Sequence, residues 1–179
     1  ITIASGGPVG IYNNQLNNTV SYGILLSNPG FSSGPSNKIT ISGNSINHVG
    51  VGVHMPAQIA KGVDIISNFF SNITSNYVSV TSNNVNISYN NLIGPSSYTS
   101  SAILLTSSSD NSTIVYNNLV NLSGNGARVF DISESVLNIS NNNITNCKTG
   151  YYVNVDDVNV SETNISNCTN NFFLPTGAE

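Results

Sequence analysis

The acidic side chains are the groups in this 179-residue chain that could carry out acid–base chemistry. Seven of the twelve charged residues lie between Arg128 and Glu162, and this stretch includes Asp131, Asp156 and Asp157. Paired carboxylates can act as general acid and base on a glycosidic bond, or they can hold a cation. We therefore treat Asp131, Asp156 and Asp157 as candidate catalytic residues, with a surface ion pair between Arg128 and Asp131 as the competing interpretation.

Other reactive residue types are sparse. The two histidines, His48 and His54, belong to no recognisable metal or catalytic motif, and no nucleophile elbow, phosphate loop or zinc-protease pattern is present. We therefore expect no metal and no cofactor. The formal net charge of −4, with only four Lys and Arg in the chain, argues against a nucleic-acid partner. No apolar run reaches the roughly 18–20 residues of a membrane helix.

The elements that must position these residues follow from a repeat. Six asparagines and one threonine recur at spacings of 30, 24, 22, 27, 25 and 21 residues. They are Asn14, Asn44, Asn68, Asn90, Asn117, Asn142 and Thr163. Of the 21 positions five and three residues before and two residues after them, 20 are apolar. A fixed register with this period is typical of a solenoid.

Each repeat has the pattern apolar–x–apolar–x–x–Asn–x–apolar, and its first apolar pair alternates with the period of a strand. A second short strand is expected after the Asn, and a third apolar run follows, such as Ile24–Leu26, Ile103–Leu105 and Tyr151–Val153. The sequence therefore predicts one all-β domain over residues 1–179, a right-handed parallel β-helix of about seven coils with three short strands per coil.

A second polar column lies four residues after the first and predicts a second Asn-rich corner. It contains Asn18, His48, Asn72, Gly94, Asn121, Asn146 and Asn167. Asparagine tolerates left-handed backbone and bonds to its own turn, and stacked asparagines can bond to one another as a ladder. His48 is expected to replace an asparagine at this corner, and Asn72, Asn121 and Asn167 are expected to face inward.

The coil pattern resembles the right-handed parallel β-helix repeats of the pectate-lyase-like group, which includes carbohydrate-binding and sugar-hydrolase modules. The resemblance rests on Ile39-Thr-Ile41-x-x-Asn44-x-Ile46, on Leu137-x-Ile139-x-x-Asn142-x-Ile144 and on the five related segments. It implies the fold, whereas function varies widely on this scaffold. A leucine-rich repeat is the competing architecture, but the additional leucine column that it requires is missing.

The predicted coils bring some candidate residues together. Cys147 and Cys168 occupy one column in adjacent coils, so a disulfide and two packed thiols are both open. Asp131 and Asp156 each lie 14 residues after the Asn of their coil, which would stack them on neighbouring coils. Hydrolases of the family resembled place Asp residues on successive coils. The offset from the preceding glycine differs by one, however, and such a slip would turn one side chain to the other face.

Tyrosines and glycosylation motifs complete the set of candidate sites. Tyr89 and Tyr116 share an outward column, where they could stabilise the sheet or bind sugar faces. Ten Asn-x-Ser/Thr motifs are present, about three more than chance gives from 32 Asn and 41 Ser plus Thr. Asn86, Asn138 and Asn159 lie between two inward positions, so we expect them to face water and to be the glycan acceptors.

These observations favour a non-enzymatic structural or adhesive β-solenoid at the cell surface or outside the cell. Neither end of the chain carries a clear cap, so we expect either a segment of a longer solenoid or subunits that stack end to end into a filament. A polysaccharide hydrolase or lyase, and a carbohydrate-binding module, are the alternative functions.

Overall fold

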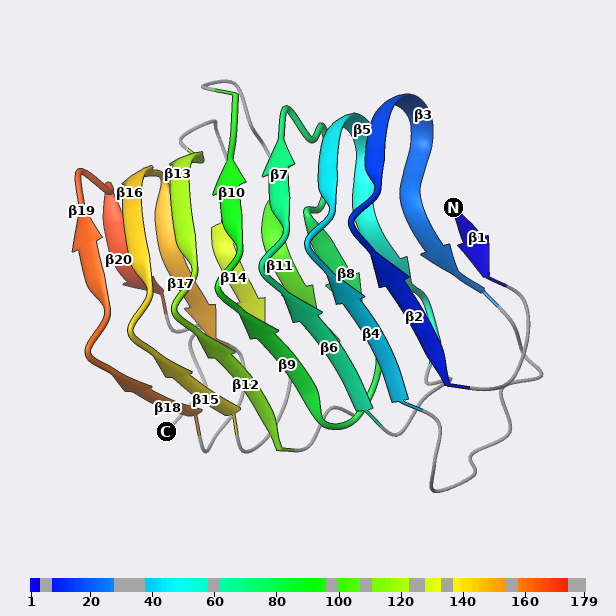
Figure 1. The fold of residues 1–179 in the computed structure, drawn as a ribbon. Coiled ribbons are helices and arrows are strands. Elements are labelled where there is room, and N and C mark those ends of the chain that lie inside the picture. Colours follow the sequence, from blue (N-terminus) through cyan, green and yellow to red (C-terminus); the bar gives the residue numbers. More distant parts are fainter. Residues whose placement is uncertain are drawn as a thin grey trace.

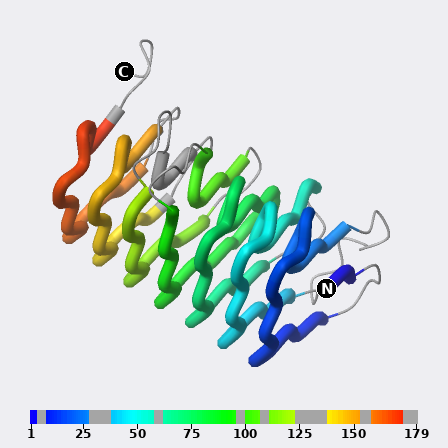
Figure 2. Tube along the Cα trace, turned by 90° about the horizontal axis from the view of Figure 1, so that it is seen from above, coloured from blue at the N-terminus to red at the C-terminus, as the bar shows by residue number. Residues whose placement is uncertain are grey.

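The computed structural model describes residues 1–3, 8–27, 38–57, 62–95, 100–106, 111–122, 128–132, 137–153 and 158–173. These residues form strands joined by turns, and all of the strand pairs are parallel. Within these ranges, no helix has the length and hydropathy needed to cross a membrane. The chain winds as a parallel β-helix whose coils lie side by side along one axis (Figures 1 and 2).

One sheet contains seven strands, one from each coil, in the order β18-β15-β12-β9-β6-β4-β2. We number the coils 1 to 7 by these strands, starting from β2. Their bounds are β2 Val9–Tyr12, β4 Lys38–Ser42, β6 Gly62–Ile66, β9 Val85–Ser88, β12 Ser112–Val115, β15 Leu137–Ser140 and β18 Val158–Ser161. The register aligns the predicted apolar columns, for example Ile11 with Ile41 and Ile41 with Ile65.

A second sheet contains 13 strands and wraps around the rest of the coil. One arm consists of β7 Phe69–Ser71, β10 Asn91–Ile93, β13 Asn118–Leu122, β16 Asn143–Cys147 and β19 Asn164–Ser166. The other arm consists of β8 Val78–Val80, β11 Ser101–Leu105, β14 Arg128–Ile132, β17 Thr149–Val153 and β20 Asn170–Phe173. Three more strands, β1 Thr2–Ile3, β3 Gln15–Leu26 and β5 Ser45–Met55, pair in the order β1-β3-β5, and β5 joins the two arms.

Five coils have three separate strands, fewer than the seven such coils that we expected. In coils 1 and 2, the second and third strands are merged into the long strands β3 and β5. The merged strands pack closely, since a Cβ added at Gly52 in β5 would collide with the backbone oxygen of Tyr77. Glycine at this bend therefore allows β5 to run against the next coil without interruption.

The core is a set of apolar columns along the axis of the helix. Its fully buried members include Ile41, Ile65, Ile87 and Ile114 from the seven-stranded sheet, and Ile46, Phe70, Leu92 and Leu119 from the next strand of each coil. The predicted inward positions are therefore confirmed in the central coils. Equivalent side chains in β2 and β18, such as Val9 and Val160, are only partly buried, since each of these strands pairs with one described strand rather than two.

Candidate functional site

The feature that links the coils most regularly is a ladder of buried asparagines, which we call the internal ladder. The Oδ1 atom of Asn44 accepts hydrogen bonds from both the backbone N and the Nδ2 of Asn14, each at 2.9 Å. The same pair of hydrogen bonds is repeated, at 2.9 to 3.0 Å, across the pairs Asn44–Asn68, Asn68–Asn90, Asn90–Asn117 and Asn117–Asn142. The ladder predicted for the first asparagine column is thus confirmed from Asn14 to Asn142.

From Asn44 to Asn142, each amide of the internal ladder has a further partner in the preceding coil. The Nδ2 atoms of Asn44, Asn68 and Asn90 donate to the carbonyl oxygens of Ile11, Ile41 and Ile65, respectively, at 2.8 to 3.0 Å. In the same way, the Nδ2 atoms of Asn117 and Asn142 donate to the carbonyl oxygens of Ile87 and Ile114. Asn44, Asn68, Asn90, Asn117 and Asn142 are only 1 to 2% exposed. A buried amide must have its hydrogen bonds satisfied, and these side chains meet that demand.

A left-handed residue lies directly before each position of this column. The φ angles of these seven residues range from 49° to 68°. The residues are Asn13, Gly43, Ser67, Tyr89, Tyr116, Asn141 and Glu162. This backbone turns the chain sharply between the first and second strands of the coil, and it aims the following asparagine into the interior.

The second asparagine column is a corner, but it does not face inward as we expected. Asn18, His48, Asn72, Asn121, Asn146 and Asn167 all have left-handed backbone with φ between 52° and 62°. Asn72 and Asn167 are exposed and Asn121 is half-buried, so the expectation that they point into the core is wrong. In this column Asn146 donates to Asn121 at 3.0 Å, whereas Asn72 donates to Asn47 of the neighbouring coil.

The structure also contains an asparagine ladder that we did not predict, on the outer surface of the second strands. The Nδ2 of Asn118 donates to Oδ1 of Asn91, that of Asn143 donates to Asn118, and that of Asn164 donates to Asn143, at 2.8 to 3.0 Å. These four residues are half-buried or exposed. We call them the external ladder. In coils 1 to 3 the same column holds Gln15, Ser45 and Phe69, which hid the pattern in the sequence.

Tyr89 and Tyr116 form the outward stack that the sequence predicted. Their ring centroids are 5.1 Å apart and the rings are inclined by only 6°, with 59% and 50% of the two residues exposed. Both are left-handed residues, a conformation that is unusual for a bulky side chain. The ring faces between them cover each other, so the exposed area of the pair lies elsewhere on the two residues.

The backbone register of β14 and β17 differs from the one we expected for the candidate acids. Asp131 in β14 lies opposite Tyr152 in β17, not opposite Asp156. The reason is the length of the connection between the second and third strands. Leu122 pairs with Cys147, and Arg128 pairs with Thr149. Coil 5 therefore has four more residues between these two points than coil 6. Counting from the Asn column therefore misaligned the two acids. The side chain of Asp131 and all of Asp156 and Asp157 lie outside the described residues.

The two cysteines are joined by a disulfide, with their Cα atoms 4.5 Å apart. Cys147 ends β16 and is 2% exposed, and Cys168 follows β19 in the next coil, where it is partly buried. The bond therefore ties coil 6 to coil 7 from within the core.

The two histidines lie in different surroundings. His48 is exposed and lines a shallow cavity of about 400 Å³ together with Asn18, Thr19, Val20, Val49, Gly50 and Thr74. His54 stacks on Tyr22 with ring centroids 5.0 Å apart. Burial lowers the pKa of His54 below its usual value, and a hydrogen bond with the backbone of Ser79 partly offsets this effect. In the part of the chain that the structure describes, no three His, Cys, Asp or Glu residues gather as metal ligands would.

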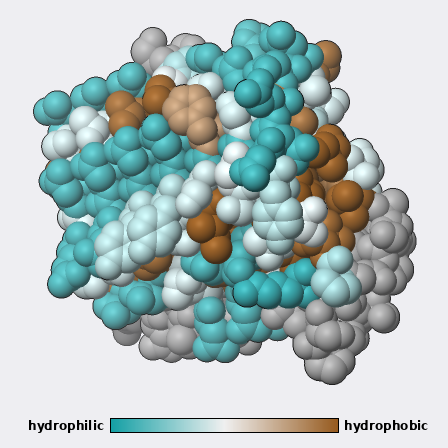
Figure 3. All heavy atoms as spheres, viewed as in Figure 1, coloured by the Kyte–Doolittle hydropathy of each residue, from teal (hydrophilic) through white to brown (hydrophobic). Residues whose placement is uncertain are grey.

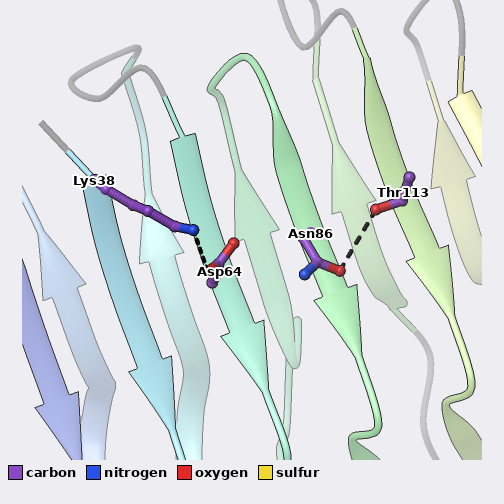
Figure 4. Close-up of polar contacts among 4 residues, drawn as sticks. All are labelled: Lys38, Asp64, Asn86 and Thr113. Atoms are coloured by element: carbon purple, nitrogen blue, oxygen red, sulfur yellow. Dashed lines mark hydrogen bonds and ion pairs between the residues drawn. The ribbon is translucent and has the colours of Figure 1, made fainter. Parts of the chain in front are cut away.

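The outer face of the seven-stranded sheet carries a row of polar residues in which the predicted glycan acceptors lie. Lys38 in β4 pairs with Asp64 in β6 at 2.7 Å, and Thr113 in β12 donates to Asn86 in β9 at 3.4 Å (Figure 4). Asn138 and Asn159 continue the row in β15 and β18, opposite each other, and both are exposed. Hydrophilic side chains cover most of the face shown in Figure 3.

No family model, curated protein or solved structure matches this chain. The parallel β-helix and its Asn ladders are therefore identified from the geometry of the structure.

Proposed function

We propose that this chain is a non-enzymatic structural β-solenoid that acts outside the cell or at its surface as a rigid spacer or adhesive element. The observation that carries the proposal is the internal ladder, which links six successive coils through buried amides. A continuous set of satisfied polar bonds along the axis favours a stiff, uniquely registered rod. The disulfide is consistent with an oxidising compartment, where such bonds form and persist.

Pulling the protein by its two ends in a single-molecule force experiment tests this role. We expect the intact rod to resist and then to yield in steps of about one coil, because neighbouring coils are the units of contact in a solenoid. Asn117→Ala, in the middle of the internal ladder, should lower the force at which steps occur. Extension of the wild-type protein without a measurable force step would contradict a role as a rigid spacer.

Self-association end to end belongs to the same proposal. The strands β2 and β18 are the two edges of the seven-stranded sheet, and edge strands present unpaired backbone groups to a partner. Stacking of this kind would extend the rod into a filament. Light scattering at increasing concentration should show a growing mass, and a monomer that persists at high concentration would contradict it.

Glycosylation of the outer row is also proposed, and the hydrogen bonds rank its acceptors. Asn138 and Asn159 are exposed, so a sugar on Nδ2 would extend into solvent. Asn143 and Asn164 lie in equally good motifs, but their Nδ2 atoms donate within the external ladder. We expect glycopeptides from a secretory host to carry sugar at Asn138 or Asn159. Occupancy confined to Asn143 and Asn164 would contradict this ranking.

A carbohydrate-contacting role is the second candidate, and one observation favours it. The stacked pair Tyr89 and Tyr116 stays exposed although its backbone is left-handed, and strained residues often mark functional sites. Aromatic rings beside the amides of Asn91 and Asn118 could bind sugar hydroxyls and ring faces. A relationship to the pectate-lyase-like group would fit this role. Glycan-array binding that is lost in Tyr89→Ala would support it, and equal binding by both proteins would contradict it.

A further inference from the structure

The boundary between coils 6 and 7 is the place where the internal ladder lacks an asparagine. The position is taken by Thr163, whose Oγ1 donates to the carbonyl oxygen of Ser161 in its own coil at 3.2 Å. On the other side, Asn142 donates back to Ile114 of coil 5. A hydroxyl has one donor, and that of Thr163 is used within its own coil, so it does not donate to the preceding coil as the amides of Asn44 and Asn68 do. The ladder therefore ends at Asn142.

The disulfide crosses this same boundary. At the equivalent column of coils 2, 3 and 5 the residues are Val49, Ile73 and Leu122, which are buried and only pack. Coils 6 and 7 alone have Cys147 and Cys168 there, joined covalently. The covalent bond thus coincides with the one interval where the threonine replaces the asparagine.

The apolar side chains of coil 7 are less buried than those of coil 6, and the side chain of Thr163 also forms a hydrogen bond with the hydroxyl group of Tyr151 in coil 6. Val158, Val160 and Ile165 are partly buried, whereas Ile139 and Ile144 beneath them are fully buried. Phe172 stacks on Tyr151 with centroids 4.8 Å apart but is 53% exposed. Backbone bonds of the parallel sheets remain, for example from the N of Asn164 to the carbonyl oxygen of Asn142 at 2.9 Å. Because coil 7 has less buried apolar area and no asparagine of the internal ladder, we expect its stability to depend on the disulfide.

We propose that the Cys147–Cys168 disulfide is a redox-sensitive tie that replaces the missing rung of the internal ladder. A dithiol reductant supplies two electrons and two protons, the S–S bond breaks into two thiols, and the reductant is itself oxidised to a disulfide. Reduction frees β18, β19 and β20 to open while coils 1 to 6 stay closed. The inference concerns the stability of one coil and does not depend on the proposed function.

Opening of coil 7 would change the surface of the rod. It would uncover the edges of β15, β16 and β17 together with Ile139, Ile144 and Tyr151, which are now fully buried. An uncovered apolar edge is available for pairing with another strand. In an oxidising compartment the tie keeps this edge covered, and in a reducing one it does not.

Hydrogen exchange of the backbone amides tests the tie on the wild-type protein. The oxidised form and the form held reduced by a dithiol are compared, peptide by peptide. We expect exchange in β18–β20 to rise on the order of 100-fold on reduction, as loop entropy predicts for a 21-residue separation, with coils 1 to 5 unchanged within about twofold. Unchanged exchange in coil 7, or an equal rise in all coils, would overturn the proposal.

A rescue experiment tests whether the tie replaces a ladder rung. In a Cys147→Ala/Cys168→Ala background, Thr163→Asn restores the amide, and we expect it to slow exchange in coil 7 about tenfold. The matched control is Thr169→Asn, which adds an asparagine at an exposed position of the same coil and should leave exchange unchanged. If Thr163→Asn and Thr169→Asn had equal effects, or if Thr163→Asn had none, the idea that the disulfide takes the place of a ladder rung would be contradicted.

Discussion

Two asparagine ladders run along this solenoid, and they differ in burial. Asn90 and Asn117 of the internal ladder are each 1% exposed, and Nδ2 of Asn90 donates to Oδ1 of Asn117 at 3.0 Å. Their chain neighbours Asn91 and Asn118 belong to the external ladder, are half-buried, and bond at 2.9 Å. The residue type and the bond length match, so a contact map alone would rank the two ladders as equals.

Burial makes the two ladders energetically different. An amide at the surface that loses its partner bonds to water, so the net value of its hydrogen bond is small. An amide in the interior that loses its partner is left unsatisfied, which costs its full desolvation. The internal ladder is therefore expected to determine stability and register, whereas the external ladder follows from the regular stacking of the coils.

The largest expected effect comes from removing an internal rung. Asn90→Ala removes the acceptor of the backbone N and one Nδ2 bond of Asn68, and it removes the side-chain donor to the carbonyl oxygen of Ile65. Oδ1 of Asn117 loses one of its two donors and keeps the backbone N of residue 90. We expect the free energy of unfolding, measured in urea, to fall by about 3 kcal/mol or more. The adjacent Asn91→Ala is the matched control and should cost less than about 0.5 kcal/mol. Equal losses for the two variants would refute the distinction.

The next effect is the coupling between rungs. A double-mutant cycle on Asn90 and Asn117 should give an interaction free energy of about 1 to 2 kcal/mol, because the two side chains share one buried network. The corresponding cycle on Asn91 and Asn118 should give less than about 0.5 kcal/mol. Additive losses in the internal pair would mean that each rung acts alone and that the ladder is not a network.

The sequence predicted the internal ladder because its residues are the invariable part of each repeat. Buried positions tolerate few residue types, so Asn and its apolar neighbours recur with little variation. The external ladder could not be predicted in this way, because a surface position tolerates many residue types. Its column contains Gln15, Ser45, Phe69 and Asn91 in successive coils. The carboxylates were misaligned for another reason: connection lengths vary between coils, and only strand pairing places Asp131 opposite Tyr152.

A smaller effect separates backbone strain from ring stacking in the outward column. Tyr89→Ala loses the stack on Tyr116 but keeps a left-handed residue, so unfolding should become easier by about 1 kcal/mol. Tyr89→Asn loses the same stack, but asparagine tolerates left-handed backbone, so its loss should be smaller. Thermal unfolding of both variants measures the difference, and a greater loss for Asn than for Ala would contradict the explanation.

The smallest effect concerns pH, to which neither ladder responds because amides do not titrate. Burial lowers the pKa of His54 below its unfolded value of 6.5, so the unfolded chain takes up the proton first as the pH falls. The contribution is complete above about pH 6.5 and is lost as the pH drops through the folded pKa. His54→Phe keeps an aromatic ring on Tyr22 and should flatten this pH dependence of unfolding. An unchanged slope would show that other groups cause it.

The most direct measurement of the difference between the ladders is hydrogen exchange of the asparagine side-chain amides, followed by nuclear magnetic resonance on one sample. The account predicts that the Nδ2 protons of Asn68, Asn90 and Asn117 exchange as slowly as the core backbone amides. Those of Asn118 and Asn143 should exchange near the rate of a solvent-exposed amide. Comparable protection of both ladders would contradict the claim that, of the two ladders, only the internal one stabilises the stack of coils.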